Sequence, residues 1–322
     1  MRDLRRRSGQ LGGVGWWLSL TGKIVGIAIA LPAVVPLLSS AQTPPLPLTE
    51  TPFRPPATEL PEVSTELSLT LNQVSFDASD LTDRVQGMVK AAVPYDIEAP
   101  PYLNGAPTHL QFTFRNAVTD LFPDSYPSVG RLYVYPVGGW RGLYAGYRQE
   151  MRDVNLLLGR LRSLLTLRPL YIADEVAILP NLSATQVLRS QVSYLNFQSG
   201  SGVRFLTTYS QELSPIARSN LFYTFQGMSS DGKYYISFYH PILTAVLPET
   251  VADLITADNY DAFVAEYENY LRRITQQINV QDAASFAPTL TQLDTMVRSL
   301  RITPAPSPAP TSAPDPSLVP AL

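Results

Sequence analysis

The residues of this chain that could do chemistry are few and scattered. There are no cysteines and only two histidines, His109 and His240. A chain without cysteine has no thiolate nucleophile, no disulfide and no zinc–cysteine site, and two histidines are too few for a multi-histidine metal site. The sequence also lacks a P-loop and a dinucleotide-binding glycine fingerprint. We therefore expect no metal site and no cofactor, and we assign no catalytic residue.

Carboxylates are numerous but have no diagnostic spacing. The pairs that stand close in sequence are Asp174–Glu175, Asp77 with Asp80, and Glu266 with Glu268. Each pair could support acid–base chemistry or bind calcium through oxygen ligands, and each is also typical of a solvated surface. Because the acidic pairs of glycosidases meet only in the fold, a hydrolase that uses dispersed carboxylates stays open as an alternative.

The strongest positive feature is a concentration of tyrosine in four predicted strands. Strand alternation must place these rings on both faces of a sheet, so one set belongs to the core. If the other face is open, tyrosines with Arg204 and Gln226 would form a platform for sugars, peptides or lipids. The candidate ligand-binding residues are Arg204, Tyr209, Tyr223, Gln226, Tyr235, Tyr239 and His240. The alternatives are that helices cover this face, or that tyrosine merely suits strands.

The spacing of apolar residues predicts the elements that carry these side chains. Alternation of apolar and polar residues predicts strands at 67–71, 109–115 and 131–137. Apolar residues then recur at helical spacing from Tyr147 to Leu165, and Pro169 lies just beyond the predicted end of this helix.

Two hairpins and two helices complete the predicted fold. Strands at 191–197 and 203–209 flank one glycine-containing turn, and strands at 221–228 and 233–239 flank another. Asp258 is the expected cap of a helix that carries Phe263, Tyr267, Leu271, Ile274 and Ile278, and Leu290, Leu293, Val297 and Leu300 mark a last helix. Blocks of strands and blocks of helices indicate an α+β fold, an antiparallel sheet with helices packed on one face.

Two segments within residues 180–248 carry a resemblance. They are Gly202-Val203-Arg204-Phe205-Leu206-Thr207, and Phe225-Gln226-Gly227 followed by Asp231-Gly232-Lys233-Tyr234-Tyr235. Both are similar to segments of an uncharacterised family of exported bacterial proteins with no established activity, so the resemblance implies an exported module and supplies no catalytic residues. The order of strands and helices is also loosely similar to PsbP-like sheet proteins, but a fold does not fix a function.

The first 41 residues are typical of a signal peptide. Five basic residues and one acidic residue precede an uncharged, mostly apolar run from Ile24 to Leu38, which is short for a membrane-spanning helix. Small residues end this segment, which predicts cleavage between Ala41 and Gln42. The alternative is that the segment is retained as a membrane anchor, because residues 11–22 could lengthen the apolar stretch.

Proline marks the remaining boundaries. Residues 43–62 contain seven prolines, and residues 304–322 contain seven more. We therefore predict a Pro-rich linker at 42–64, a single domain at 65–302 and a disordered tail at 303–322. Removal of the signal peptide takes away five positive charges and one negative charge. The net charge then changes from −3 for the full chain to −7 for the mature chain, which argues against nucleic acid as a partner.

These observations favour a non-enzymatic binding or interaction module that works outside the cytoplasm: secreted, periplasmic or at the cell envelope. The expected partner is an envelope protein, a glycan or a small apolar ligand, with a membrane contacted only through an uncleaved signal segment. A hydrolase and a structural envelope component are the alternatives.

Overall fold

The structure is a computed structural model, and it describes the central part of the chain. The described residues are 69–98, 105–115, 127–172, 175–176, 178–180, 184–251, 254–256 and 259–303. The chain divides into two units, Met1–Thr58 and Glu59–Leu322, and every described residue belongs to the second. The predicted signal peptide and linker, and the tail after Thr303, lie outside the described residues.

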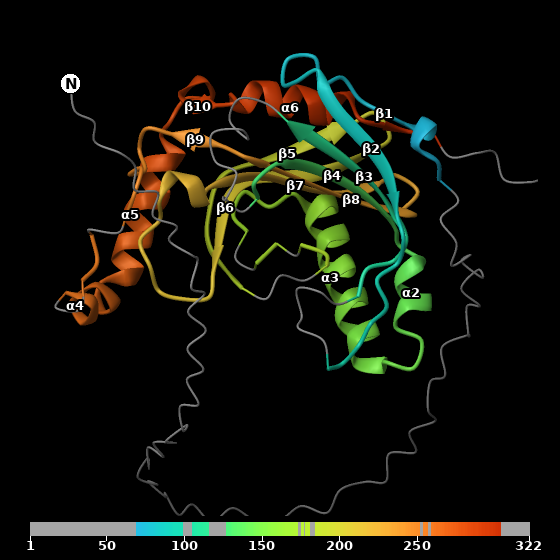
Figure 1. The fold of residues 1–322 in the computed structure, drawn as a ribbon, viewed down its shortest axis with the longest axis horizontal. Coiled ribbons are helices and arrows are strands. Elements are labelled where there is room, and N and C mark those ends of the chain that lie inside the picture. Colours follow the sequence, from blue (N-terminus) through green and yellow to red (C-terminus); the bar gives the residue numbers. More distant parts are fainter. Residues whose placement is uncertain are drawn as a thin grey trace, which may run out of the picture. The chain divides into compact units, whose positions relative to one another are not determined.

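A seven-stranded antiparallel sheet forms the centre of the fold (Figure 1). The order of its strands is β2-β3-β4-β8-β7-β6-β5. Their bounds are β2 Arg84–Lys90, β3 His109–Arg115, β4 Gly130–Pro136, β5 Thr185–Phe197, β6 Gly200–Ser210, β7 Phe222–Ser229 and β8 Tyr234–Pro241. Two short pairs, β1 (Val74–Ser75) with β11 (Arg301–Ile302) and β9 (Leu243–Thr244) with β10 (Phe286–Ala287), lie outside this sheet.

Both predicted hairpins are confirmed. Strands β5 and β6 pair until Phe197 stands opposite Gly200, so the connection is tighter than the sequence indicated. Strands β7 and β8 are joined through Gly232, whose φ of 69° is one that glycine adopts without strain. Inside the β6–β7 pair, a Cβ on Gly202 would lie 2.2 Å from Phe225 Cζ, so only glycine fits there.

Helices pack on both faces of the sheet, which confirms the α+β class and corrects the predicted one-sided arrangement. The helices are α2 Gly139–Leu143, α3 Arg148–Leu167, α4 Tyr260–Ala265, α5 Tyr267–Asn279 and α6 Leu290–Ser299. Helix α3 packs through Leu158 and Leu161 in one apolar cluster with Phe205 of β6. Helix α6 packs through Leu293 in a second cluster with Leu206 of β6. Figure 1 shows α3 and α6 on opposite sides of the sheet.

The reason for this two-sided cover is visible in the central strands. All eight residues of β7 are buried, so this strand needs apolar cover on both faces. Each fully buried apolar side chain of α3 contributes about 1.5–3 kcal/mol relative to exposure, and four such residues, Val154, Leu158, Leu161 and Leu165, hold the helix on the sheet. The prediction placed the helices on one face because apolar periodicity identifies a helix but does not show which face of a sheet the helix covers.

Three further predictions need correction. Of the strand expected at 67–71, the structure describes residues 69–71, and these form no strand: Leu71–Gln73 is a 3-10 turn, and the preceding Thr70 N–H donates to Gln73 Oε1 at 2.7 Å. The helix expected from Asp258 is broken at Glu266 into α4 and α5, and Asn259 is the residue before α4, while Asp258 lies outside the described residues. Strand β2 was missed because it is an exposed edge strand with little apolar alternation.

Candidate functional site

The seven residues predicted to bind a ligand lie on two different faces of the sheet. Arg204, Tyr223 and His240 lie on the face of the sheet that α6 covers, whereas Tyr209, Gln226, Tyr235 and Tyr239 are on the face that α3 covers. The pairing of β6, β7 and β8 and the two apolar clusters fix this division. The structure therefore does not bring the seven together into one platform.

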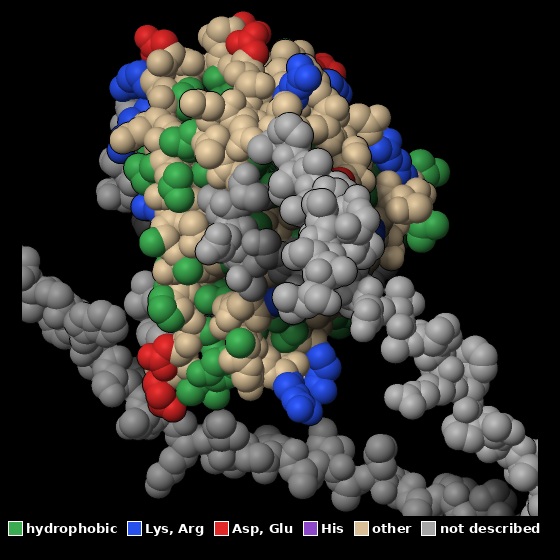
Figure 2. Space-filling model, turned by 90° about the vertical axis from the view of Figure 1, so that its right-hand side faces the viewer, with side chains coloured by type: hydrophobic (Ala, Val, Ile, Leu, Met, Phe, Trp, Pro, Cys, Tyr) green, Lys and Arg blue, Asp and Glu red, His purple; other side chains and the backbone are tan. Residues whose placement is uncertain are grey.

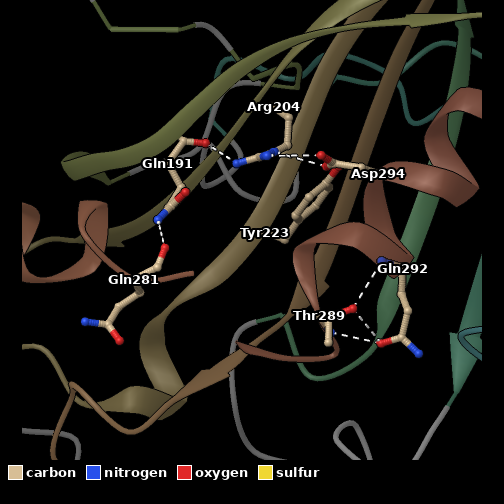
Figure 3. A network of polar contacts seen from close by, with 7 residues as sticks. All are labelled: Gln191, Arg204, Tyr223, Gln281, Thr289, Gln292 and Asp294. Carbon is tan, nitrogen blue, oxygen red and sulfur yellow. Dashed lines mark hydrogen bonds and ion pairs between the residues drawn. The ribbon is translucent and has the colours of Figure 1, made fainter. Parts of the chain in front are cut away.

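Arg204 and Tyr223 belong to a buried polar network that fastens α6 to the sheet (Figure 3). Arg204 Nε and Nη2 donate to the two carboxylate oxygens of Asp294 at 3.1 and 3.0 Å, and Tyr223 OH donates to Asp294 Oδ1 at 2.9 Å. Arg204 Nη1 also donates to Gln191 O. Because the Arg204 guanidinium, the Asp294 carboxylate and the Tyr223 hydroxyl all have hydrogen-bond partners inside the protein, the network is a structural element and not an open site.

His240 is also part of the core. Its side chain is fully buried, and its Nδ1 lies 2.7 Å from the Pro241 carbonyl oxygen. Burial lowers the pKa of His240 to about 4. The imidazole is therefore neutral at pH 7, and the geometry gives it no access to a ligand.

Gln226 and Tyr235 satisfy each other on the opposite face. Tyr235 OH donates to Gln226 Oε1 and accepts from Leu179 N at 3.0 Å, and Gln226 Nε2 donates to Thr224 Oγ1 at 2.7 Å. Burial raises the pKa of Tyr235. These polar groups are internally paired beneath the cover that α3 provides.

Tyr209 and Tyr239 are the predicted residues that remain half-buried. Tyr209 OH accepts from Gln186 Nε2 at 3.1 Å, and the Tyr239 ring lies 5.6 Å from the Tyr133 ring, centroid to centroid. Burial raises the pKa of both hydroxyls, so they are neutral hydrogen-bonding groups at pH 7 and cannot serve as bases.

The carboxylate pairs have local structural partners. Hydrogen bonds from Ser79 lower the pKa of the exposed Asp77, and Glu266 Oε2 accepts from Asn269 Nδ2 at 2.8 Å. Asp174 lies outside the described residues. Among the residues that the structure describes, no group of three or more His, Asp or Glu side chains could hold a metal ion.

A surface that the prediction did not single out carries exposed apolar side chains. The exposed fractions are 52% for Leu156, 76% for Leu167, 107% for Leu170 and 81% for Tyr171. Leu156 and Leu167 are eleven residues apart, about three helical turns, so they lie on one side of α3. Exposed apolar side chains that gather on one surface are a common feature of interaction sites.

Leu156, Leu167 and Tyr171 line a groove with a volume of about 550 Å³. One wall is the outer side of α3 from Asn155 to Leu167, and the other is formed by Pro169, Tyr171, Ile172 and Glu175. Gly159 and Ser163 lie between Leu156 and Leu167 and leave the groove open, because a Cβ on Gly159 would meet no atom within 4 Å. The volume lies within the range of about 300–1,000 Å³ that is usual for small-molecule sites.

Strand β5 holds the second wall in place. The chain turns after α3 at Arg168, which adopts a left-handed conformation with a φ of 45°. Tyr194 OH then donates to Pro169 O at 3.0 Å, and the Arg189 guanidinium donates to Ile172 O. Ile172 itself is buried in the cluster beneath α3. The groove is thus fixed by contacts with the sheet and does not need a ligand to form.

The described lining of the groove consists mostly of apolar and small residues. Arg160 and Glu175 are the charged residues among the described residues that line it, and Glu175 is the only carboxylate there. A hydrolase of the glycosidase type needs two facing carboxylates, and the described lining of this groove supplies one. Leucines with small residues between them instead offer apolar area for a ligand.

The sequence did contain a signal for this groove. Leu156 and Leu167 fall outside the apolar stripe of α3 that packs on the sheet, and Gly159 and Ser163 share their side of the helix. The second wall, by contrast, is placed by long-range hydrogen bonds from β5, which sequence periodicity does not reveal.

Comparisons of the chain with protein-family models, with curated proteins and with solved structures gave no match. The resemblance of the β6 and β7–β8 segments to exported bacterial proteins therefore stays a prediction, as does the likeness to PsbP-like sheets. No helix in the described part of the chain is long and apolar enough to span a membrane.

Proposed function

We propose that this protein is an exported, non-enzymatic binding protein of the cell envelope or extracellular space, and that the groove beside α3 holds a small apolar ligand. The signal-like segment at 1–41 supports the location, and the paired, buried state of the predicted polar residues supports a role without catalysis. The observation that carries the proposal is the preformed groove of about 550 Å³ between Leu156 and Leu167.

The energetics favour an apolar occupant. Burial of apolar surface contributes about 25 cal/mol per Å², so covering the exposed leucines and Tyr171 stabilises a complex by several kcal/mol before the cost of association. The walls are fixed by the sheet, so little ordering of the protein opposes binding.

Titration with N-phenyl-1-naphthylamine, a neutral apolar fluorophore, tests this proposal. We expect saturable, enhanced fluorescence with one site per chain. Ser163→Trp fills the groove and should weaken binding at least tenfold. Thr166→Trp is the matched control, because Thr166 is exposed on the same helix but does not line the groove.

Equal binding by the Ser163→Trp and Thr166→Trp proteins would contradict the groove as the site, and the lack of any saturable signal would contradict the proposed function. The exported state is tested separately by sequencing the N-terminus of the protein recovered from its native cell, which should begin near Gln42.

A further inference from the structure

A second cavity lies at the other end of α3, against α2. Its volume is about 420 Å³, and its lining residues are Arg141, Tyr144, Gly146, Arg148, Met151 and Arg152. Three of these six are arginines, in a chain whose net charge is −3. Figure 2 shows both Lys or Arg and Asp or Glu side chains at the lower end of the molecule, the end at which Figure 1 places the turn between α2 and α3.

The three guanidinium groups have no acidic partner within the described part of the chain. None of them forms an ion pair there, and Arg152 Nη2 instead donates to Gln149 Oε1 at 2.5 Å. Two acids lie nearby and keep their negative charge, because their donors are neutral: Glu150 Oε1 accepts from Tyr95 OH at 2.9 Å, and Asp153 Oδ1 accepts from Gln149 Nε2 at 2.8 Å. The described lining of the cavity therefore carries three positive charges and no carboxylate, with Glu150 and Asp153 outside it.

The backbone around the cavity is held by aromatic packing. The Tyr144 ring lies 6.2 Å from the Trp140 ring in a stacked arrangement and 5.2 Å from the Tyr95 ring in an edge arrangement. Gly146 adopts a φ of 95°, which lets the chain turn from α2 into α3. This turn places Arg141 of α2 and the exposed Arg148 and Arg152 of α3 around the same cavity.

We propose that this cavity binds a phosphate group. The planar guanidinium donates two parallel hydrogen bonds to phosphate oxygens, and three such groups around one space can surround a tetrahedral anion of charge about −2. The first-turn N–H groups of the twenty-residue α3 have no side-chain cap, and they add a smaller favourable term for the same anion. This site is separate from the apolar groove, and the experiment that tests it measures the binding of phosphate and not of an apolar compound.

Isothermal titration of the full chain with inorganic phosphate at fixed ionic strength tests the site. We expect one phosphate per chain, and we expect chloride at the same ionic strength not to reproduce the binding. The variant Arg141→Gln with Arg148→Gln and Arg152→Gln should bind at least tenfold more weakly. A matched control replaces three exposed arginines elsewhere, Arg162, Arg272 and Arg273, with glutamine and should stay within twofold of the parent.

The control separates the site from net charge, since both variants lose three positive charges. Equal weakening in the two variants, or no phosphate binding by the parent, overturns the proposal. Arg148→Lys gives a second test, because lysine keeps the positive charge but lacks the planar guanidinium that donates two parallel hydrogen bonds. It should weaken phosphate binding several-fold and leave the circular dichroism spectrum unchanged.

Two sources could supply the phosphate, a soluble phosphorylated compound or a phospholipid head group. Flotation with vesicles of phosphatidylcholine alone, and with added phosphatidylglycerol, distinguishes them. Binding only to the anionic vesicles, reversed by inorganic phosphate and lost in the triple variant, assigns a lipid head group. Phosphate binding without vesicle binding assigns a soluble compound.

Discussion

Loss of the Asp294 carboxylate should strongly destabilise the protein. Asp294 and Arg204 have side chains that are each only 9% exposed, and their closest N–O distance is 3.0 Å. Replacement Asp294→Ala leaves the Arg204 charge buried with Gln191 O as its remaining acceptor and leaves Tyr223 OH without its partner. The variant tests whether this network holds α6 on the sheet.

The expected loss follows from the contacts. Removal of one partner of a buried ion pair costs about 3–5 kcal/mol, and an unpaired buried hydroxyl costs about 1–3 kcal/mol. The two effects share one site, and Arg204 keeps one acceptor, so they do not add in full. We expect Asp294→Ala to lower the free energy of unfolding by about 4 kcal/mol in total. That is a large part of the roughly 5–15 kcal/mol by which domains are usually stable.

Urea unfolding followed by far-ultraviolet circular dichroism measures the loss. The double variant Arg204→Met with Asp294→Leu removes both charges and should return to within about 2 kcal/mol of the parent, because packed apolar residues replace buried ion pairs at little cost. The reasoning fails if Asp294→Ala lowers the free energy of unfolding by less than about 1 kcal/mol, or if the double variant is as unstable as the single one.

Three further predictions concern pH, packing and the groove wall. Burial lowers the pKa of His240 from 6.5 to about 4. The neutral imidazole therefore contributes its full stabilisation above pH 6.5, and about 3 kcal/mol of the free energy of unfolding is lost as the pH falls from 6.5 to 4. Urea titrations at pH 7 and pH 4 should show a smaller loss of unfolding free energy for His240→Gln than for the parent. Gly202→Ala should destabilise the protein by about 1–3 kcal/mol because the new Cβ meets Phe225. Gly159→Ala lies in open space on a helix and should stabilise the protein by up to about 1 kcal/mol in the same assay. Tyr194→Phe removes the hydrogen bond to Pro169 O and should weaken binding of the naphthylamine probe several-fold, with unchanged affinity showing that this bond does not position the wall.

Local signals in the sequence predicted the elements whose periodicity is strong. Helix α3 and the β5–β6 and β7–β8 hairpins were predicted because apolar spacing and glycine-containing turns are local properties. Residues 69–71 of the strand expected at 67–71 form no strand, because the side chain of Gln73 bonds to the backbone of Thr70, a local contact that competes with extended structure. The cover on both faces of the sheet was not predicted from the sequence. Its structural basis is clearest in β7, where every residue is buried.

The candidate site was harder to predict because it depends on which face each residue takes. Arg204 and Gln226 lie on neighbouring strands but point to opposite faces, a fact that follows from the register of β6 with β7. The arginine cavity joins residues of α2 and α3 that are close in sequence, yet the pattern of arginines alone was equally typical of a solvated helix surface.

The central claim is that the groove beside α3 binds an apolar ligand, and leucine-methyl NMR tests it most directly. The chain is labelled at leucine methyl groups and titrated with N-phenyl-1-naphthylamine. The methyl signals of Leu156, Leu164 and Leu167 should shift along one saturation curve, while those of the exposed Leu213 and Leu254, which do not line the groove, should stay unchanged. Shifts confined to Leu213 or Leu254, or no shift at the three groove leucines, would contradict it.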